Sequence, residues 1–327
     1  SPPQIDRLRL NAPGLSAEGT ITLRPEGGGL DTARFSRVRL GGWLDAPVIL
    51  TGRGKSVPPK VTVTGGSADL GRMNLTSSGG SGGPVSLALD TLRISDGISL
   101  RNMRGEFVTG KGMTGTFTAT VNGRAPIKGA VAPHSRGSAV RITADNAGAT
   151  LAAAGLLNKG RGGTLDLNLI PVGPKGTYDG KLDIENIWIQ DAPAMASLLS
   201  ALSIVGLLEQ MAGNGIFFGT ANADFRLTPS QVILRSASAV GASMGVSMDG
   251  IYDLDAKRMD MQGVVSPLYL INGIGRLFSR NNGEGLIGFN YRLMGAVANP
   301  RVTVNPLSLF TPGMFREIFR RPPPTTN

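Results

Sequence analysis

The sequence predicts a mainly β fold: an elongated antiparallel β-sheet that forms a groove or a half-closed sandwich, with about three short amphipathic or apolar helices in the C-terminal half. Two observations predict it. Apolar and polar residues alternate over short stretches that end at Gly, Pro or Asn, which is the pattern of half-buried antiparallel strands. Glycine accounts for 47 of 327 residues. That is about twice the ~7 % average, and its spacing at strand-length intervals favours short strands joined by tight turns.

Short alternating segments make up most of the expected strands. In residues 116–121, Phe117, Ala119 and Val121 face one way while three threonines face the other. Successive strands of this kind indicate a meander with one apolar and one polar face. Further strands are expected at residues 21–23, 38–40, 48–50, 61–63, 87–89, 165–169, 216–218, 232–234, 246–248 and 289–293.

Two connections between strands can also be recognised. A hairpin is expected in which Tyr252 and Leu254 face Met259 and Met261. The segment 77–83 consists only of serine and glycine. We therefore expect a flexible hairpin loop or a linker between two halves of the sheet.

The alternation stops after Asp191. No charged residue occurs from Ala192 to Leu208, and large apolar residues recur there at helical spacing. Asp191 is expected to be the N-cap, with Pro193 in the first turn. A bilayer-spanning helix needs ~20 apolar residues. Because serines and a glycine dilute this run, the range 192–212 predicts a buried or interfacial helix.

Two further helices are expected near the C-terminal end. Ser266 and Pro267 are suited to begin a helix over 267–280, whose apolar stripe lies opposite polar and basic residues. A third helix over 312–321 places apolar residues opposite three arginines, and the proline run 322–324 ends it.

The charge composition restricts the possible partners. The formal net charge is +10 and the sequence pI is about 10.4, which suits nucleic acid or an anionic membrane surface. The basic residues are scattered, however, and the longest run is Arg320-Arg321. A nucleic-acid footprint clusters its charge, so no nucleic-acid partner is expected. The absence of cysteine excludes structural disulfides and thiolate metal sites and leaves the compartment open.

No catalytic motif stands out. His134 is the only histidine and has no acidic neighbour in the sequence, so a general base is not expected there. Asp183 and Glu185 fall on one strand face, as on an ordinary polar sheet surface. The glycines of 110–115 precede no helix and therefore form no phosphate-binding loop. We expect no enzyme, no catalytic residue, no metal and no cofactor.

The apolar face of such a sheet must be covered by another sheet, by helices or by lipid acyl chains, because a large exposed apolar patch is a liability. A closed sandwich plugged by the helices remains one possibility. Each buried methylene contributes ~0.8 kcal/mol, so an apolar groove could bind an acyl chain without specific polar contacts. The expected helices 267–280 and 312–321 combine apolar stripes with arginines, as interfacial helices do.

This reasoning selects two sets of candidate residues. The residues expected to contact lipid or membrane are Leu198, Leu199, Leu202, Val205, Leu208, Leu270, Ile271, Ile274, Leu277, Phe278, Met314, Phe315, Ile318 and Phe319. The residues expected to contact lipid headgroups by charge-assisted hydrogen bonds are Arg276, Arg280, Arg316, Arg320 and Arg321.

Five stretches carry a resemblance to a known family: 162–167, 191–203, 241–245, 283–291, and 305–308 followed by 312–316. From about residue 110 onward the chain resembles the C-terminal region of the AsmA-like family of bacterial envelope proteins, in its YhdP-type branch. The resemblance implies a protein anchored in the inner membrane whose groove-like β-sheet crosses the periplasm and conducts phospholipids between the two membranes.

The resemblance also implies a division of the chain. Residues 1–110 would be the N-terminal part of the sheet in a fragment of a longer chain, and 111–327 the AsmA-like C-terminal region. The chain begins Ser1-Pro without an initiator Met, which fits a fragment. The expected location is the periplasm, with anchoring through a segment upstream.

Taken together, the sequence predicts an intermembrane phospholipid transport module. It would bind acyl chains in an apolar β-groove and dock on a membrane surface through its C-terminal helices. The alternative is a non-catalytic structural or assembly factor that binds other envelope proteins, for example by strand addition at its sheet edges. An enzyme acting on envelope glycans is a third possibility, because carboxylates are plentiful.

Overall fold

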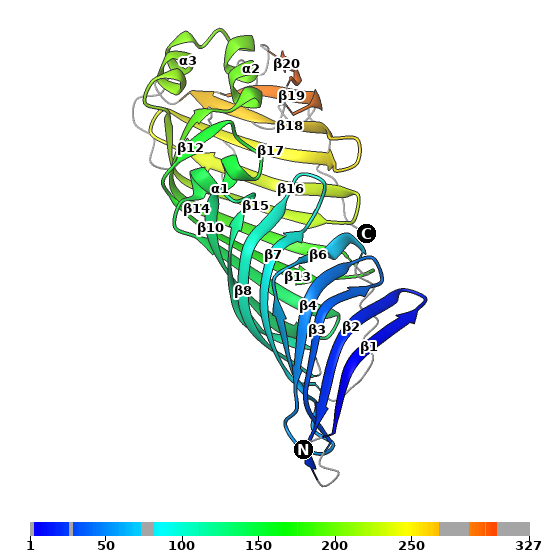
Figure 1. The fold of residues 1–327 in the computed structure, drawn as a ribbon. Coiled ribbons are helices and arrows are strands. Elements are labelled where there is room, and N and C mark those ends of the chain that lie inside the picture. Colours follow the sequence, from blue (N-terminus) through cyan, green and yellow to red (C-terminus); the bar gives the residue numbers. More distant parts are fainter. Residues whose placement is uncertain are drawn as a thin grey trace. The chain divides into compact units, whose positions relative to one another are not determined.

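The computed structural model describes residues 3–25, 29–72, 82–110, 112–174, 176–267, 288–297 and 299–305. The described chain is mainly β, and its twenty strands belong to one hydrogen-bonded sheet (Figure 1). It divides into two compact units, Ser1–Ile142 and Thr143–Asn327. The prediction of a mainly β fold with a few short helices is confirmed.

The first unit contains most of the shorter strands. Its strands are β1 (Gln4–Ala12), β2 (Leu15–Leu23), β3 (Leu30–Leu40), β4 (Leu44–Thr51), β5 (Lys60–Thr64), β6 (Ser67–Asp69), β7 (Pro84–Arg93), β8 (Ser99–Thr109), β9 (Met113–Val121) and β10 (Ala125–His134), followed by β11 (Gly137–Ala144) at the boundary. A single turn of 3-10 helix, η2 (Leu70–Arg72), follows β6. Consecutive strands pair antiparallel from β1 to β4 and from β7 to β10.

The pairing between β4 and β7 departs from a simple meander. β4 pairs antiparallel with both β5 and β6, and these two strands pair in parallel with β7. β5 and β6 therefore share one position in the sheet, interrupted at Gly65 and Gly66, whose φ values are 112° and 75°. A Cβ on Gly66 would lie 2.3 Å from the carbonyl oxygen of Asp45, so the interruption requires glycine. The sheet is thus mixed, because the sequence pattern of a strand does not specify its pairing direction.

The second unit combines longer strands with three helices. Its elements are α1 (Ala147–Ala153), β12 (Lys159–Arg161), β13 (Thr164–Pro171), β14 (Tyr178–Asp191), α2 (Pro193–Ala201), α3 (Val205–Ala212), β15 (Ile216–Leu227), β16 (Gln231–Val240), β17 (Met244–Asp253), β18 (Arg258–Pro267), β19 (Phe289–Ala296) and β20 (Arg301–Asn305). Strands β13 to β20 pair antiparallel in chain order. β12 also pairs with β14, beyond the end of β13.

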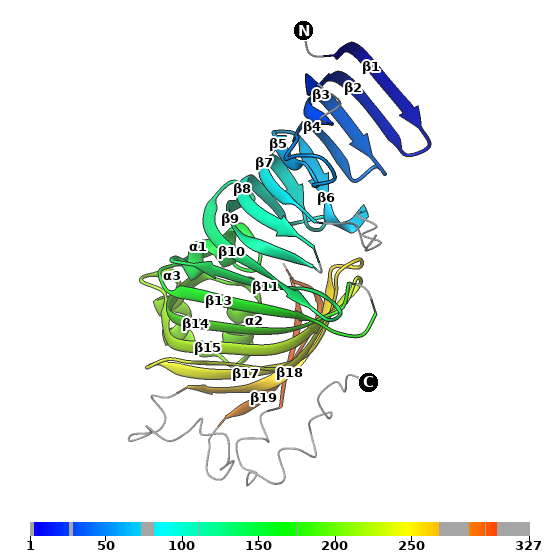
Figure 2. The ribbon, with the colours of Figure 1, turned by 90° about the horizontal axis from the view of Figure 1, so that it is seen from below.

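Helices α2 and α3 are inserted between β14 and β15. α2 packs against β20, and α3 packs against β14 and β15. Figure 2 shows both helices on one side of β13, β14 and β15. Their inward residues, among them Leu198, Leu199, Leu207 and Met211, are buried. No helix within the described ranges is both long and apolar enough to cross a bilayer.

Several sequence predictions about these elements need correction. The expected helix 192–212 is two helices, because Ser203 between them has a φ of 56°. The N-cap of α2 is Ala192 and not Asp191, which belongs to β14, although Pro193 is in the first turn as expected. α1 was not predicted, since its seven residues are too short for a visible helical period. Ser266 and Pro267, which were expected to begin the helix 267–280, are instead the last residues of β18 and pair with Gly245 and Met244. The rest of that range, the expected helix 312–321 and most of the segment 77–83 lie outside the described residues.

The expected hairpin is formed by β17 and β18, with a different register from the one predicted. A loop at 255–258 would place Leu254 opposite Met259 and Tyr252 opposite Met261. In the structure Tyr252 pairs with Met259, and Met261 pairs with Gly250. Leu254 lies in the connection, which turns at Lys257 with a φ of 52°.

Candidate functional site: a continuous apolar face of the sheet

One face of the sheet in the first unit is apolar across nine strand positions. The strand register brings apolar residues of successive strands directly opposite one another, so that they form rows perpendicular to the strands. One such row is Ile5, Ile21, Ala33, Leu50, Val61, Val85, Phe107, Gly115 and Val131. A neighbouring row is Leu8, Gly19, Phe35, Val48, Val63, Leu87, Gly105, Phe117 and Gly129.

The second unit has the same organisation over eight strands. One row is Leu167, Leu182, Ala223, Ala237, Met248, Gly263, Tyr291 and Val304. The rows on its two sides are Leu165, Ile184, Ala221, Ala239, Val246, Val265 and Phe289, and Leu169, Gly180, Phe225, Leu234, Gly250, Met261, Leu293 and Val302. We refer to these three rows together as the apolar face of the second unit.

The opposite face is polar, because side chains alternate along each strand. On β15 the exposed residues are Thr220, Asn222 and Asp224, whereas Ala221 and Ala223 between them are half-buried. The cross-strand neighbours of Asn222 on the polar face are Asp183 and Ser238. The two faces of the sheet therefore differ in chemistry at β15, as the alternation in the sequence predicted.

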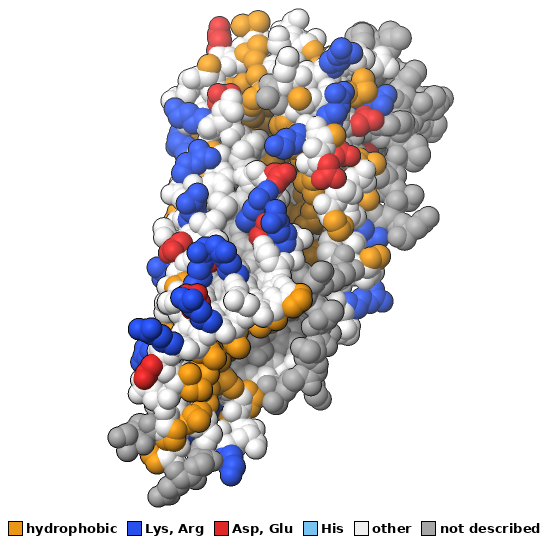
Figure 3. Space-filling model, turned by 45° about the vertical axis from the view of Figure 1, so that its right-hand side comes forward, with side chains coloured by type: hydrophobic (Ala, Val, Ile, Leu, Met, Phe, Trp, Pro, Cys, Tyr) orange, Lys and Arg blue, Asp and Glu red, His pale blue; other side chains and the backbone are white. Residues whose placement is uncertain are grey.

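The burial of the apolar face of the second unit varies from strand to strand. Its central row is half-buried from β13 to β17 and becomes buried at β18 and β19. Tyr291 in this row is 3 % exposed, and its hydroxyl donates a hydrogen bond of 2.7 Å to the Ser247 carbonyl oxygen. Burial raises the pKa of Tyr291, so the phenol is neutral. On the side of the molecule shown in Figure 3, hydrophobic side chains also reach the surface in continuous bands.

Aromatic rings in the rows lie over glycines of the neighbouring strand. A Cβ on Gly129 would lie 2.1 Å from Cζ of Phe117, and one on Gly180 would lie 2.2 Å from Cζ of Phe225. In both cases the glycine and the aromatic residue are direct cross-strand partners. The rings therefore cover the glycine backbone and lie flat against the sheet. At these positions the side chains project only a short way above the sheet surface.

The residues predicted for membrane contact in α2 and α3 divide into two groups. Leu198 and Leu199 are 3 % and 0 % exposed, so they belong to the core between the helices and the sheet. Leu202 and Leu208 are half-buried, and Val205 is 60 % exposed. Leu207, which the prediction did not include, is buried, whereas Leu208 is only half-buried. The break at Ser203 rotates α3 relative to a continuous helix, so a different residue faces the core.

The remaining predicted contact residues lie outside the described residues: Leu270, Ile271, Ile274, Leu277, Phe278, Met314, Phe315, Ile318, Phe319 and the headgroup candidates Arg276, Arg280, Arg316, Arg320 and Arg321. Within the ranges that the structure describes, the apolar face is a feature that could bind a ligand. The sequence indicated its alternation, but the row alignment became visible only with the register.

Ion pairs hold the polar face together. Arg226 makes a bidentate contact with Asp179, with Nε 2.9 Å from Oδ1 and Nη2 3.3 Å from Oδ2, and Nη2 of Arg235 lies 2.6 Å from the same Oδ1. The hydrogen bonds from Arg226, together with the charge of Arg235, lower the pKa of Asp179. Arg292 and Asp260 form a similar bidentate pair at 3.0 Å.

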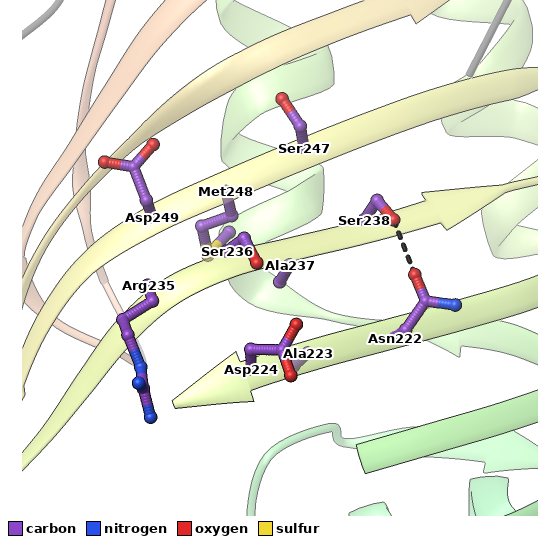
Figure 4. A pocket seen from close by; sticks show the side chains of 10 residues that line it. All are labelled: Asn222, Ala223, Asp224, Arg235, Ser236, Ala237, Ser238, Ser247, Met248 and Asp249. Atoms are coloured by element: carbon purple, nitrogen blue, oxygen red, sulfur yellow. Dashed lines mark hydrogen bonds between the residues drawn. The ribbon is translucent and has the colours of Figure 1, made fainter. Parts of the chain in front are cut away.

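A pocket of about 330 Å³ opens among β15, β16 and β17 (Figure 4). Asn222 accepts a 2.8 Å hydrogen bond from Ser238, and the carboxyl groups of Asp224 and Asp249 also line the pocket. Arg235 occupies a β-bulge between these strands, and Figure 4 shows its side chain directed away from Ser238. Gln262 donates to the buried Asp249 at 2.9 Å.

The described residues offer little catalytic machinery. Nδ1 of His134 accepts a hydrogen bond from the backbone N–H of Arg136 at 3.3 Å, which is a turn contact at the end of β10. Asp183 lies on the polar face, 3.7 Å from Lys181. The glycines near residue 110 lead into strand β9, as expected for a turn. Among the described side chains, no three His, Cys, Asp or Glu residues are grouped so that they could hold a metal ion.

Comparisons with known proteins give no match: no family model, no curated protein and no solved structure is similar to this chain.

Proposed function

We propose that the chain is an intermembrane phospholipid transport module of the bacterial periplasm, and that it binds acyl chains along its apolar face. The observation that carries the proposal is the alignment of apolar residues into unbroken rows across the strands of each unit. The resemblance to the AsmA-like family supports the same function, and it would also imply anchoring in the inner membrane through a further segment.

The dimensions of the rows suit an acyl chain. Strands lie ~4.8 Å apart, so the half-buried part of the central row, from β13 to β17, extends roughly 19 Å. The hydrocarbon core of a bilayer is ~30 Å thick, so one acyl layer is roughly 15 Å. A chain lying along a row would contact apolar side chains over its full length. It could also move from one position to the next without entering water.

The energetics favour binding without tight selectivity. Each methylene removed from water contributes ~0.8 kcal/mol, so ten methylenes in contact with a row contribute roughly 8 kcal/mol before the entropy loss of the chain. Such binding depends on area and not on polar contacts. It therefore suits a module that accepts phospholipids with different headgroups.

Membrane docking completes the proposed function. The exposed side of α3, together with the sequence ranges 267–280 and 312–321, would contact the bilayer, with the arginines of those ranges at lipid phosphates. This part rests on the amphipathic sequence pattern.

The second candidate is a structural or assembly factor that binds other envelope proteins. The free edge of β1 favours it, because within the described residues this strand pairs on one side only, with β2, and is exposed along nearly its whole length. An edge of this kind can accept a strand from a partner. A factor of this class would be purified without lipid.

The decisive experiment is native mass spectrometry of the purified protein, with solvent extraction to identify bound lipid. The matched variants are Ala223→Glu on the apolar face and Asn222→Glu, one residue earlier on the polar face. An unpaired carboxylate against hydrocarbon costs more than about 1.4 kcal/mol, so we expect Ala223→Glu to lose bound lipid at least about tenfold. Asn222→Glu should retain it.

Circular dichroism must show that both variants are folded. Full lipid occupancy in folded Ala223→Glu would refute binding at the apolar face. A lipid-free wild type that stays lipid-free after incubation with phospholipid vesicles would favour the assembly factor.

A further inference from the structure

Two large apolar side chains of the second unit are more exposed than any other among the described residues. Val205, at the start of α3, is 60 % exposed, and Leu156, in the connection between α1 and β12, is 57 % exposed. Neither belongs to the rows of the apolar face. The apolar area of these two side chains is exposed to water, so its burial against another apolar phase would be favourable.

Direct contacts tie both segments to the same end of β14. The backbone N–H of Asn158 donates to the Asp191 carbonyl oxygen at 3.0 Å, and its side-chain amide donates to the Asp191 carboxylate at 3.2 Å. This fixes the loop that carries Leu156 beside the last residue of β14. α3 packs on β14 and β15, and Nη2 of Arg161 donates to the Asn214 carbonyl oxygen, just beyond α3, at 3.2 Å.

An aromatic and cationic cluster is formed by residues of β12, β14 and β15. The guanidinium of Arg161 is 4.8 Å from the centre of the Trp188 ring, which in turn is 5.0 Å from the ring of Phe217. Trp188 is half-buried. Lys159, which lies opposite Asp191 in the pairing of β12 with β14, is exposed. A tryptophan that is part apolar and part hydrogen-bonding, next to cations, is typical of the boundary between lipid and water.

The helical insert has no charged residue along most of its length. No charge occurs from 192 to 208, although Ser200, Ala201, Ser203, Val205 and Gly206 are exposed. The acidic groups nearby are Asp191, which is bonded to Asn158, and Glu209, one turn after Val205. An exposed helical turn without charges is compatible with insertion into the apolar edge of a bilayer.

We propose that this surface, formed by Leu156, Lys159, Arg161, Trp188 and Val205, docks on a phospholipid bilayer that contains anionic lipid. Leu156 and Val205 enter the acyl boundary, Trp188 lies at the level of the headgroups, and Lys159 and Arg161 contact phosphates. The combination of exposed apolar side chains, an uncharged helical turn and a tryptophan in contact with a cation selects a bilayer, which offers an apolar layer next to phosphates. The inference rests on the membrane association in the proposed function and is independent of lipid cargo.

The chain itself supplies two fluorescent reporters for a test. Its two tryptophans are Trp43 in the first unit and Trp188 in the second, and both are half-buried. In Trp43→Phe the emission reports Trp188 alone, and in Trp188→Phe it reports Trp43 alone. Each protein is mixed with vesicles of phosphatidylethanolamine and phosphatidylglycerol, with or without bromine on the acyl chains.

We expect Trp188 emission to shift to shorter wavelength and to be quenched by brominated lipid, while Trp43 emission stays unchanged. Quenching of Trp43 alone, or of both tryptophans equally, would overturn the assignment of the docking surface. Flotation of the protein without any response of Trp188 would do the same and would leave membrane association intact. No flotation at all would overturn both this inference and the membrane docking in the proposed function.

Substitutions then test the individual residues. Leu156→Asp and Val205→Asp should each lower the vesicle partition coefficient at least about tenfold. Val108→Asp is the matched control, since Val108 is 54 % exposed but lies on β8 of the first unit. Because all three side chains are exposed, these variants should remain folded. Equal loss of partitioning in all three variants would refute the role of this surface.

The charge dependence gives an independent readout. Lys159→Gln should weaken partitioning onto vesicles with phosphatidylglycerol and leave partitioning onto neutral phosphatidylcholine vesicles unchanged. Glu209→Gln should strengthen partitioning onto the anionic vesicles, because it removes repulsion. The opposite sign for Glu209→Gln would contradict the proposed orientation of α3.

Discussion

The contact between Phe117 and Gly129 predicts a substitution whose effect is opposite to the usual one. Gly to Ala in a strand ordinarily stabilises, by ~0.5–1 kcal/mol, because the unfolded chain loses conformational freedom. At Gly129 the new Cβ would lie 2.1 Å and 2.2 Å from two ring carbons of Phe117. The ring is 8 % exposed and has little room to move away.

The expected magnitude follows from these two opposing effects. Overpacking in a filled core costs ~1–3 kcal/mol. After the usual gain is subtracted, Gly129→Ala should lower the free energy of unfolding by ~1–2 kcal/mol. Gly97 provides the control, since a Cβ there would meet nothing within 4 Å and its φ is not in the left-handed region. Gly97→Ala should be neutral or stabilising.

The assay is urea unfolding followed by fluorescence of Trp43, in a Trp188→Phe background, so that the signal comes from the first unit. Phe117→Leu removes the ring, and in that background Gly129→Ala should cost at least about 1 kcal/mol less than in the wild type. This difference is the coupling energy of the pair. If Gly129→Ala stabilises as much as Gly97→Ala, the ring of Phe117 does not cover Gly129. The inference that aromatic rings lie flat on glycines in the rows would then be refuted.

Three further substitutions test local features of the second unit, with Trp188 as the reporter in a Trp43→Phe background. Asp179→Asn should lower the free energy of unfolding near pH 7 by ~1–2 kcal/mol, because Arg226 loses a charged partner that is only partly screened. Asn146→Ala should cost ~1 kcal/mol, since its side chain accepts from the Ala149 N–H at 3.0 Å and caps α1. Ser203→Gly should stabilise by up to ~1 kcal/mol, because a serine with a φ of 56° is strained.

The pH dependence of the Asp179 effect has a definite sign. The folded-state pKa of Asp179 lies below its ordinary value of 3.8, so the ionised carboxylate favours the folded state. Its contribution is fully present above that value and is lost as the pH falls through the folded-state pKa. The difference between wild type and Asp179→Asn should therefore shrink in acid. A difference that stays constant down to the acid transition would point to packing and not to charge.

The strand segments could be predicted because the alternation of apolar and polar residues is visible within each short segment. In β9, Phe117 and Val121 alternate with threonines, and the structure buries the first set and exposes most of the second. The register was less accessible. The hairpin of β17 and β18 was predicted, but its register was not. Leu254 was placed in a strand although it lies in the turn, and Met259 pairs with Tyr252 instead. The turn geometry near Lys257 determines the register of the hairpin, and the alternation of apolar and polar residues does not indicate that geometry.

Long-range features could not be read from the sequence. The parallel pairing of β5 and β6 with β7 joins segments whose order along the chain gives no sign of direction. The contact of α2 with β20 joins residues about a hundred positions apart. The cluster of Arg161 with Trp188 was missed because its members lie on different strands, although two tryptophans in so long a chain were a signal worth following.

The sizes of the residues in the rows bear on what the apolar face is for. At the centre of the second unit, Ala223 and Ala237 are direct partners in one row, and Ala221 and Ala239 are direct partners in the next. A face that only had to pack against helices would gain from larger side chains, since each added methylene contributes ~0.8 kcal/mol. Four adjacent alanines, all half-buried, forgo that gain. The pattern keeps the face apolar while leaving space above it, and that combination suits a surface over which a separate apolar molecule passes.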